Sequence, residues 1–286
     1  MPHFLDITED GRPLDGDRLS TFFPLRVEGI GAWLRGAPDW SHLRAVLRGE
    51  QDLRQDAPTK PAAPSLPPAE RRRAPENVLL AADVAGQACT MAKRDPASLA
   101  CVFASSYGEL AITDYMCATL ASTPRELSPT KFHNSVHNAP VGYWTIATQC
   151  TASSSAITGG RDSFGAGLLE AAMLAWADRA PVLFVACDIA SIGPLADMTR
   201  TTRAFGAAFL LSPSQDPNLR PAMVLRVRND EATVPMPDAA ELQPLAADNP
   251  LNAHALAFLA ALAGGSRTRV ILPAAKKLLL DVEIRA

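Results

Sequence analysis

The chain has 286 residues, of which 48% are hydrophobic and 20% charged, and its formal net charge is −3 at pH 7. This balance is typical of a folded protein with a sizeable core and excludes a wholly disordered chain. A slightly acidic chain also argues against generic nucleic-acid binding, which needs a basic surface to displace phosphate counterions.

The sequence predicts no membrane span. No apolar run reaches the roughly 18 residues that a membrane-spanning helix needs. The N-terminal stretch MPHFLDITEDGRPLDGD is acidic and polar, whereas a secretory leader begins basic and continues apolar. We therefore expect a cytoplasmic protein.

The five cysteines are widely spaced and form no CxxC pair, which argues against a zinc site or a redox dithiol. We interpret each of them as a small buried hydrophobe in a reducing compartment. Nothing in the sequence calls for a metal, nucleotide or flavin, so no cofactor is predicted.

Strand and helix patterns alternate along the chain. An apolar run over residues 25–33, broken by Gly29 and Gly31, predicts a first strand that runs into a turn. Asp39 is expected to cap a helix that reaches Gly49. Residues 51–76 hold six of the 24 prolines and predict an extended excursion.

The later elements continue this alternation. Helices are predicted over residues 77–94, 112–120, 162–176 and 252–263, with one more that follows a polar loop within 128–149. Strands are predicted over residues 99–105, 153–160, 181–188, 204–211, 223–228, 269–272 and 278–284. The strands at 204–211 and 223–228 are expected to pair with each other. Strands alternating with helices indicate a layered α/β fold.

Signatures of phosphate binding and of serine hydrolases are absent. The stretch GIGAW lacks the third glycine of a dinucleotide fingerprint, and GGRDSFGAG has no Lys-Ser/Thr pair. Ser163 fails the GxSxG pattern because the glycine before it stands three positions back. His133 and His137 are four residues apart without an acidic or cysteine ligand beside them, so we interpret them as hydrogen-bonding histidines.

Several stretches resemble a known family. LRVEGIGAW with DWSHLRAVLRGE, VFASSYGEL, and AFGAAFLL with MVLRVR resemble elements of β-ketoacyl synthases of the thiolase-like superfamily. More specifically, LPPAERRRAPE, SPTKFHNSVHNAPVGYWTIAT, DSFGAGLLEA and PVLFVACD closely resemble the ketosynthase-like chain length factors of aryl polyene gene clusters. FHNSVHNAPVGYW is the most specific of these stretches.

The resemblance implies a thiolase-like layered α-β-α fold. Residues 22–230 would be the N-terminal ketosynthase half, with the proline-rich excursion at 51–76 inside it. Residues 1–21 would be an N-terminal extension, and residues 231–286 a severely truncated C-terminal half.

The position of the nucleophile decides what the chain can catalyse. In ketosynthases the reactive cysteine sits at a strand-to-helix turn, where a helix N-terminus lowers its pKa and N–H groups stabilise the oxyanion. Two registers compete, one placing Cys150 (ATQCTA) there and the other Arg161. The next strand opens at Val182, 32 residues after Cys150 but 21 after Arg161, and a helix with a short loop needs about 20. The spacing favours Arg161.

An arginine in this position removes the nucleophile, because a guanidinium stays protonated and offers no lone pair. Arg161 is expected to fill the end of a vestigial pocket, paired with Asp162. Ketosynthases also carry two further catalytic residues, usually histidines, in the C-terminal half. The one histidine after residue 228 is His254, and neither family motif surrounds it. No catalytic residue is therefore assigned to this chain.

The resemblance implies a non-catalytic subunit that pairs with an active ketosynthase. The pair would elongate a polyene acyl chain on an acyl carrier protein, with this chain shaping the tunnel that limits product length. The two sheets would join through residues 153–158, an otherwise unpaired edge. The candidate tunnel and interface residues are Phe132, His133, Val136, His137, Asn138, Trp144, Arg161, Asp162 and Ser163.

Two alternatives stay open at this point. Instead of the non-catalytic, length-limiting subunit, the chain could be an active acyltransferase or condensing enzyme that uses Cys150. It could also be a scaffold that only stabilises the ketosynthase or recruits the carrier protein. The first requires Cys150 at a helix N-terminus, and the second differs from the preferred function only in product length.

Overall fold

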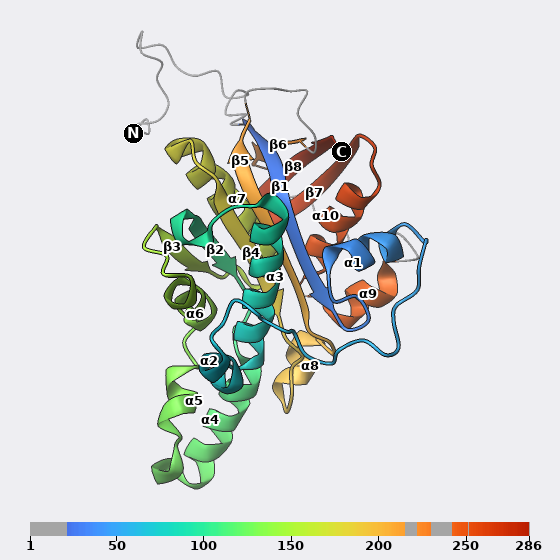
Figure 1. Ribbon diagram of the computed structural model, residues 1–286. Coiled ribbons are helices and arrows are strands. Elements are labelled where there is room, and N and C mark those ends of the chain that lie inside the picture. Colours follow the sequence, from blue (N-terminus) through green and yellow to red (C-terminus); the bar gives the residue numbers. More distant parts are fainter. Residues whose placement is uncertain (1–21, 215–221, 230–241, 251, 286) are drawn as a thin grey trace, which may run out of the picture.

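The computed structural model describes residues 22–214, 222–229, 242–250 and 252–285. Their strands form one mixed sheet in the order β3-β2-β4-β5-β1-β6-β8-β7 (Figure 1). The strands are β1 (Phe22–Leu34), β2 (Ala100–Ala104), β3 (Ser154–Ile157), β4 (Val182–Asp188), β5 (Phe205–Pro213), β6 (Ala222–Arg228), β7 (Thr268–Ala275) and β8 (Leu278–Arg285). β2 runs parallel to β3 and β4, and the other pairings are antiparallel.

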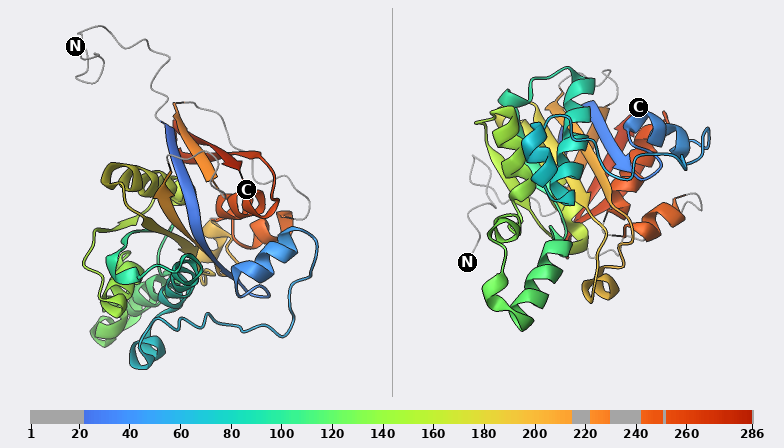
Figure 2. Two further views of the ribbon diagram at one scale, coloured as in Figure 1. Left: turned by 45° about the horizontal axis from the view of Figure 1, so that its top comes forward. Right: turned by 60° about the horizontal axis from the view of Figure 1, so that its bottom comes forward.

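Helices cover both faces of the sheet (Figure 2). They are α1 (Trp40–Leu47), α2 (Pro68–Arg73), α3 (Glu76–Ala92), α4 (Leu110–Ser122), α5 (Pro129–His133), α6 (Ala139–Thr148), α7 (Ser163–Asp178), α8 (Leu195–Thr199), α9 (Gln243–Asp248) and α10 (Ala253–Ala263). α3 and α6 pack on one face, and α7 and α10 pack on the other. The predicted α-β-α layering is therefore confirmed.

The alternation of side chains along β4 explains the two cores. Leu183 and Val185 point to the α3 face, and Phe184 points to the α7 face, where it packs against Phe164 and Phe209. Every residue of β4 is buried. A strand covered on both faces reads as a continuous apolar run.

Two of the sequence predictions are corrected here. The first strand does not break at Gly29 and Gly31, because β1 continues through both to Leu34. A Cβ at either position would collide with a carbonyl oxygen of α3, that of Ala88 or Val84. These glycines thus let α3 lie directly on the strand.

The second correction concerns β5 and β6, which do not pair with each other. β1 lies between them, so that Leu25 pairs with Pro213 of β5 on one side and with Met223 of β6 on the other. A long central strand buries both neighbours in the sheet, and this outweighs the tendency of consecutive strands to form a hairpin.

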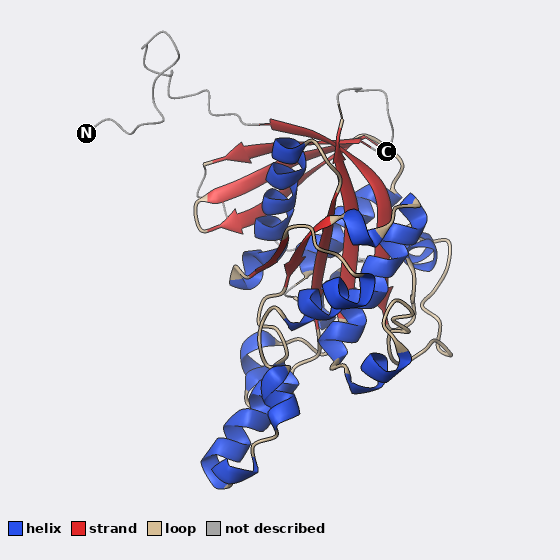
Figure 3. Cartoon of the chain, turned by 60° about the vertical axis from the view of Figure 1, so that its left-hand side comes forward, coloured by secondary structure: helices blue, strands red, loops and turns tan. Residues whose placement is uncertain are grey.

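α4 and α5 form an arm that projects from the layered body (Figure 3). Within the arm, the Lys131 ammonium lies 3.5 Å from the centre of the Tyr115 ring. The backbone N–H of Ser128 donates to the Tyr115 hydroxyl at 3.1 Å. The arm thus has internal contacts of its own. Every helix in the described ranges is too short or too polar to cross a membrane.

Candidate functional site

The carboxyl ends of β2, β3 and β4 meet at one edge of the sheet because the three strands are parallel. Three features therefore converge there: the turn from β2 to α4, the turn from β3 to α7, and the last residue of β4. The strand-to-helix turn that the sequence analysis singled out is one of them.

Arg161 lies in the turn between β3 and α7. β3 ends at Ile157, residues Gly160–Asp162 form one turn of 3-10 helix, and α7 begins at Ser163. The Arg161 side chain is exposed, and among the described residues it forms no ion pair or hydrogen bond with Asp162, contrary to the expected pairing. Partial burial raises the pKa of Asp162.

Ser163 closes this turn from within. Its buried hydroxyl donates to the Gly160 carbonyl at 2.7 Å and accepts from the Gly159 N–H at 2.9 Å. Both partners belong to the turn itself, so the hydroxyl is used for structure.

Cys150 lies on the other side of β3, just after the C-terminus of α6 and four residues before the strand begins. Its side chain is 8% exposed and its Sγ donates to the Leu99 carbonyl at 3.2 Å. Cys150 is therefore not at a helix N-terminus, the placement that a thiolate nucleophile needs.

The other cysteines divide into two kinds. Cys89, Cys101 and Cys187 are buried, and burial raises the pKa of the Cys89 and Cys101 thiols to about 12. Cys117 on α4 is exposed, so the expectation that all five are buried is wrong for this one. The arm that carries α4 is covered by little else, which explains the exposure.

Asp188, the last residue of β4, is the centre of a polar network that the sequence analysis missed. It is 3% exposed. Its Oδ1 accepts from the Ser105 hydroxyl and the Ser106 N–H, each at 2.9 Å. Its Oδ2 accepts from the Ser106 hydroxyl at 3.1 Å and from the Asn252 side-chain amide at 2.7 Å. Burial raises the pKa of Asp188 to about 6 despite these donors.

Five of the nine predicted tunnel and interface residues lie at the end of α5 or in the segment between α5 and α6. Phe132 is 58% exposed, and Val136, His133 and Asn138 are exposed as well. His137 is half-buried, with its Nε2 2.9 Å from the carbonyl oxygen of Ser105. This contact joins the predicted stretch to the β2–α4 turn.

Trp144 is separated from the other predicted residues. Only 1% of its side chain is exposed, and it packs in the core beneath α3. It therefore faces the interior of this chain.

A groove of about 430 Å³ lies between α2 and α6. His133, Val136 and Asn138 line it, together with Gly142 and Ile146. The Ile146 side chain is 80% exposed. Three of the predicted residues thus share one largely apolar hollow, although Phe132 is not among its lining residues.

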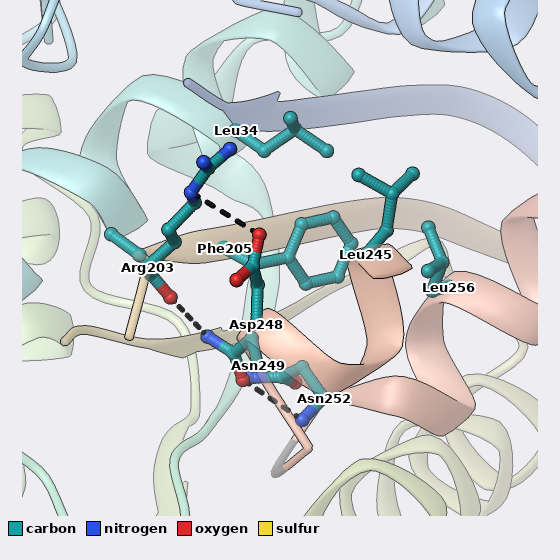
Figure 4. A pocket seen from close by; sticks show the side chains of 9 residues that line it. Leu34, Arg203, Phe205, Leu245, Asp248, Asn249, Asn252 and Leu256 are labelled. Atoms are coloured by element: carbon teal, nitrogen blue, oxygen red, sulfur yellow. Dashed lines mark hydrogen bonds and ion pairs between the residues drawn. The ribbon is translucent and has the colours of Figure 1, made fainter. Parts of the chain in front are cut away.

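A second hollow lies between β5 and the helices α9 and α10 (Figure 4). Its volume is about 20 Å³, which is room for roughly one water molecule. The Arg203–Asp248 ion pair, with a 3.2 Å N–O distance, lies beside it. It is too small for an acyl chain. No group of three His, Cys, Asp or Glu side chains in the described part of the chain could hold a metal ion.

Comparison with known proteins gives one family and a set of similar structures. The family model for the N-terminal domain of β-ketoacyl synthase matches residues 45–274. No curated protein matches the chain.

Three similar structures contain a ketosynthase together with a chain length factor or an acyl carrier protein. The first, a ketosynthase (ApeO) in complex with its chain length factor (ApeC) from Xenorhabdus doucetiae, has 22% identity, a TM-score of 0.68, and coverage of 93% of this chain and 100% of the matched chain. The ishigamide ketosynthase/chain length factor has 15% identity and a TM-score of 0.67, and the match covers 92% of this chain and 99% of the matched chain. The third, AntDE:AntF, is a type II polyketide acyl carrier protein in complex with its ketosynthase bound to the hexaketide. It has 12% identity and a TM-score of 0.66, and the match covers 92% of this chain and 99% of the matched chain. At these identities the likeness concerns the fold, and it confirms the thiolase-like layering.

Proposed function

The chain belongs to the β-ketoacyl synthase family, and from that premise we propose that it is a non-catalytic subunit of the chain length factor type. In this proposal it pairs with an active ketosynthase. The pair extends an acyl chain carried by an acyl carrier protein, and this subunit limits the length of the product.

The observation that carries the proposal is Arg161 at the turn between β3 and α7. A guanidinium cannot attack a thioester, because it keeps its proton and has no free lone pair. The buried Cys150 lies before β3 and so cannot replace it without a rearrangement of the sheet edge. His254 is buried in α10, and among the described residues neither of its ring nitrogens has a hydrogen-bond partner. These three placements support a silent subunit.

The free edge of the sheet supports a partner. Within the described ranges β3 is an outermost strand and pairs with β2 alone, so its other side offers unpaired backbone groups. Exposed apolar side chains lie on α6, which contacts β3, and along the chain toward the projecting arm: Ile146 on α6, Val136 before it, Phe132 on α5, Leu120 on α4 and Tyr107 before α4. Such a concentration is typical of a protein–protein interface.

The similar structures support the nature of that partner. Their descriptions name a ketosynthase with a chain length factor in two cases and a ketosynthase with an acyl carrier protein in the third. Each matched chain is covered over at least 99% of its length. We extend the same assembly to this chain, with Phe132, Val136 and His137 beside the partner's substrate.

A proline at Ala156 tests the pairing. The carbonyl oxygens of Ser153 and Ile157 accept hydrogen bonds from β2, so by strand alternation the Ala156 N–H faces the free side. Co-purified with its ketosynthase, the wild-type chain should give a one-to-one pair by native mass spectrometry. Ala156→Pro should fold but lose the pair, because proline has no N–H to donate.

Ala156→Gly is the matched control, since it keeps the N–H and should still pair. Equal pairing by the proline variant would show that β3 is not the interface. Failure of the wild-type chain to pair with the ketosynthase would contradict the proposed function as a whole.

A further inference from the structure

We propose that Asn252 is a positioning residue, through which the C-terminal part of the chain fixes the β2–α4 turn and, with it, His137. The proposal rests on the proposed function, because it assigns a role to the surface that faces the partner. It is carried by an unbroken set of hydrogen bonds from α10 to the stretch between α5 and α6.

The first link is Asp188, whose two carboxylate oxygens are shared between neighbours. Oδ1 serves the β2–α4 turn alone, and Oδ2 joins the Ser106 hydroxyl to the Asn252 amide. The partners of Asp188 lie 64 to 83 residues away from it in sequence. A single buried carboxylate therefore connects the C-terminal segment to the edge of the sheet.

Asn252 bonds Asp188 instead of capping the helix that it precedes. It stands at the N-cap of α10, where an asparagine normally accepts from a helix N–H, yet its side chain forms no capping bond. Its amide nitrogen donates to Asp188 instead. The residue type is thus explained by Asp188 and not by the helix.

Asn249 holds Asn252 in place (Figure 4). Its side-chain amide donates to the carbonyl oxygens of Asp188 at 3.0 Å and Arg203 at 2.9 Å, and its Oδ1 accepts from the Asn252 N–H at 3.1 Å. The neighbouring ion pair joins Arg203, just before β5, to Asp248, the last residue of α9. The turn before α10 is thereby anchored to the end of β4 and the start of β5.

The far links run through the carbonyl groups of the two serines. His137 lies 2.9 Å from the Ser105 carbonyl, and the Thr158 hydroxyl donates to the Ser106 carbonyl at 3.0 Å. The serines thus bond Asp188 on one side, and on the other they bond both the interface stretch and the turn that carries Arg161. A shift of Ser105 and Ser106 would therefore shift both His137 and the turn that carries Arg161.

Stability alone does not explain a carboxylate here. Burying a charge is costly, and well-packed apolar residues are often as stabilising as a buried polar network. The network instead fixes the geometry of the β2–α4 turn relative to α10, because four donors from these two elements bind the two oxygens of one carboxylate.

An exchange of the two side chains tests the link. Asn252→Asp sets two carboxylates against each other. Asp188→Asn removes the charge but keeps a hydrogen bond, because the Asn252 amide can turn over and accept through its oxygen. In the double variant, the new amide at position 188 still accepts from the serines through its oxygen, and its nitrogen donates to the new carboxylate at position 252. The pair is thereby restored with reversed roles. A milder variant, Asn252→Ala, only removes the donor. Val282→Ala, a buried residue of β8 away from the network, is the control for loss of stability.

Two readouts separate the link from its consequence. Hydrogen exchange on the full chain should be about tenfold faster at the Ser106–Gly108 amides in Asn252→Ala and in Asn252→Asp, because one strong hydrogen bond is lost. It should return toward wild type in the double variant and stay unchanged in Val282→Ala. In the complex with the ketosynthase, the same variants should broaden the product lengths, and the double variant should narrow them again.

Unchanged exchange in folded Asn252→Ala and Asn252→Asp, or a folded double variant that restores nothing, would overturn the proposal. If exchange responds but product lengths do not, Phe132→Ala decides the cause. If Phe132→Ala changes the product lengths and the Asn252 variants do not, then Asn252 does not position a group that controls product length. No change in product length in either variant would contradict the part of the proposed function by which this subunit limits product length.

Discussion

The turn between β3 and α7 assigns different tasks to neighbouring side chains. Ser163 is buried and holds the backbone of the turn, whereas Arg161 projects from it with its charge in solvent. An exposed arginine leaves the turn geometry intact without any reactive group at its tip. The fold can thus be kept by a subunit that leaves the chemistry to a partner.

Phe132 is the residue whose change should be most visible in the products. Its ring is 58% exposed at the end of α5, free to reach a partner's pocket. We expect Phe132→Ala to lengthen the acyl products of the pair, because the space left by the ring admits a longer chain. Chromatography with mass spectrometry of the released products measures this.

Met91→Ala is the matched control, since Met91 is 51% exposed but lies on α3, outside the arm. It should leave the products unchanged. An unaltered product profile for Phe132→Ala in a stable complex would remove Phe132 as a gate.

At the residue scale, the sequence predicted positions that depend on spacing along the chain and missed those that depend on tertiary contact. The distance from Arg161 to the next strand was sufficient to place it in the turn. The Asp188 network was not predictable, because its partners come from turns 64 to 83 residues away and each looks like an ordinary serine or asparagine.

At the scale of elements, α3 packs directly on the backbone of β1. Gly29 and Gly31 face carbonyl oxygens of α3 with no room for a methyl group. Because a backbone carbonyl cannot rotate away as a side chain can, the contact requires glycine at both positions.

Gly31→Ala should therefore destabilise the fold by about 1–3 kcal/mol, the usual range for overpacking a rigid contact. Urea denaturation followed by circular dichroism gives the free energy of unfolding. Gly86→Ala, in α3 itself, is the control: its new methyl would meet Ser65 at an ordinary 3.7 Å. That change should be neutral or stabilise the helix by up to about 1 kcal/mol. Equal stability of wild type and Gly31→Ala would contradict the packing argument.

The sequence predicted the long elements well because each has a clear period or a continuous apolar run. It missed α2, α5, α8 and α9, which have five or six residues each and are too short to show a helical period. The pairing of β5 with β6 was wrong, since nothing local reveals that β1 separates them.

At the scale of the whole molecule, buried titratable groups govern how stability depends on pH. Burial lowers the pKa of His254 from 6.5 to about 4, whereas burial raises the pKa of Asp188 to about 6 and that of Glu109 to about 7. The histidine and the two acids therefore act in opposite directions below neutral pH.

His254 should make the fold lose stability as the pH falls from 6.5 to 4. In this window the unfolded chain binds a proton at His254 that the folded chain rejects, so the free energy of unfolding drops by up to about 3 kcal/mol. The acids do the reverse, because their folded forms hold protons that the unfolded chain releases. The difference between wild type and His254→Met isolates the histidine.

Denaturant titrations at pH 7 and pH 4.5 measure this difference. The loss of stability on acidification should be smaller in His254→Met than in wild type. His133→Gln, which changes an exposed histidine, should leave the loss as it is. An identical acid response in His254→Met and wild type would contradict the buried, neutral state of His254.

The proposed division of labour, in which this chain holds no nucleophile and its partner performs the chemistry, can be tested by mass. The purified pair is exposed to acyl-loaded carrier protein, and the intact masses of both subunits are measured. We predict an acyl adduct on the ketosynthase and none on this chain. An adduct on this chain that disappears in Cys150→Ala would contradict the proposal and identify the chain as an enzyme in its own right.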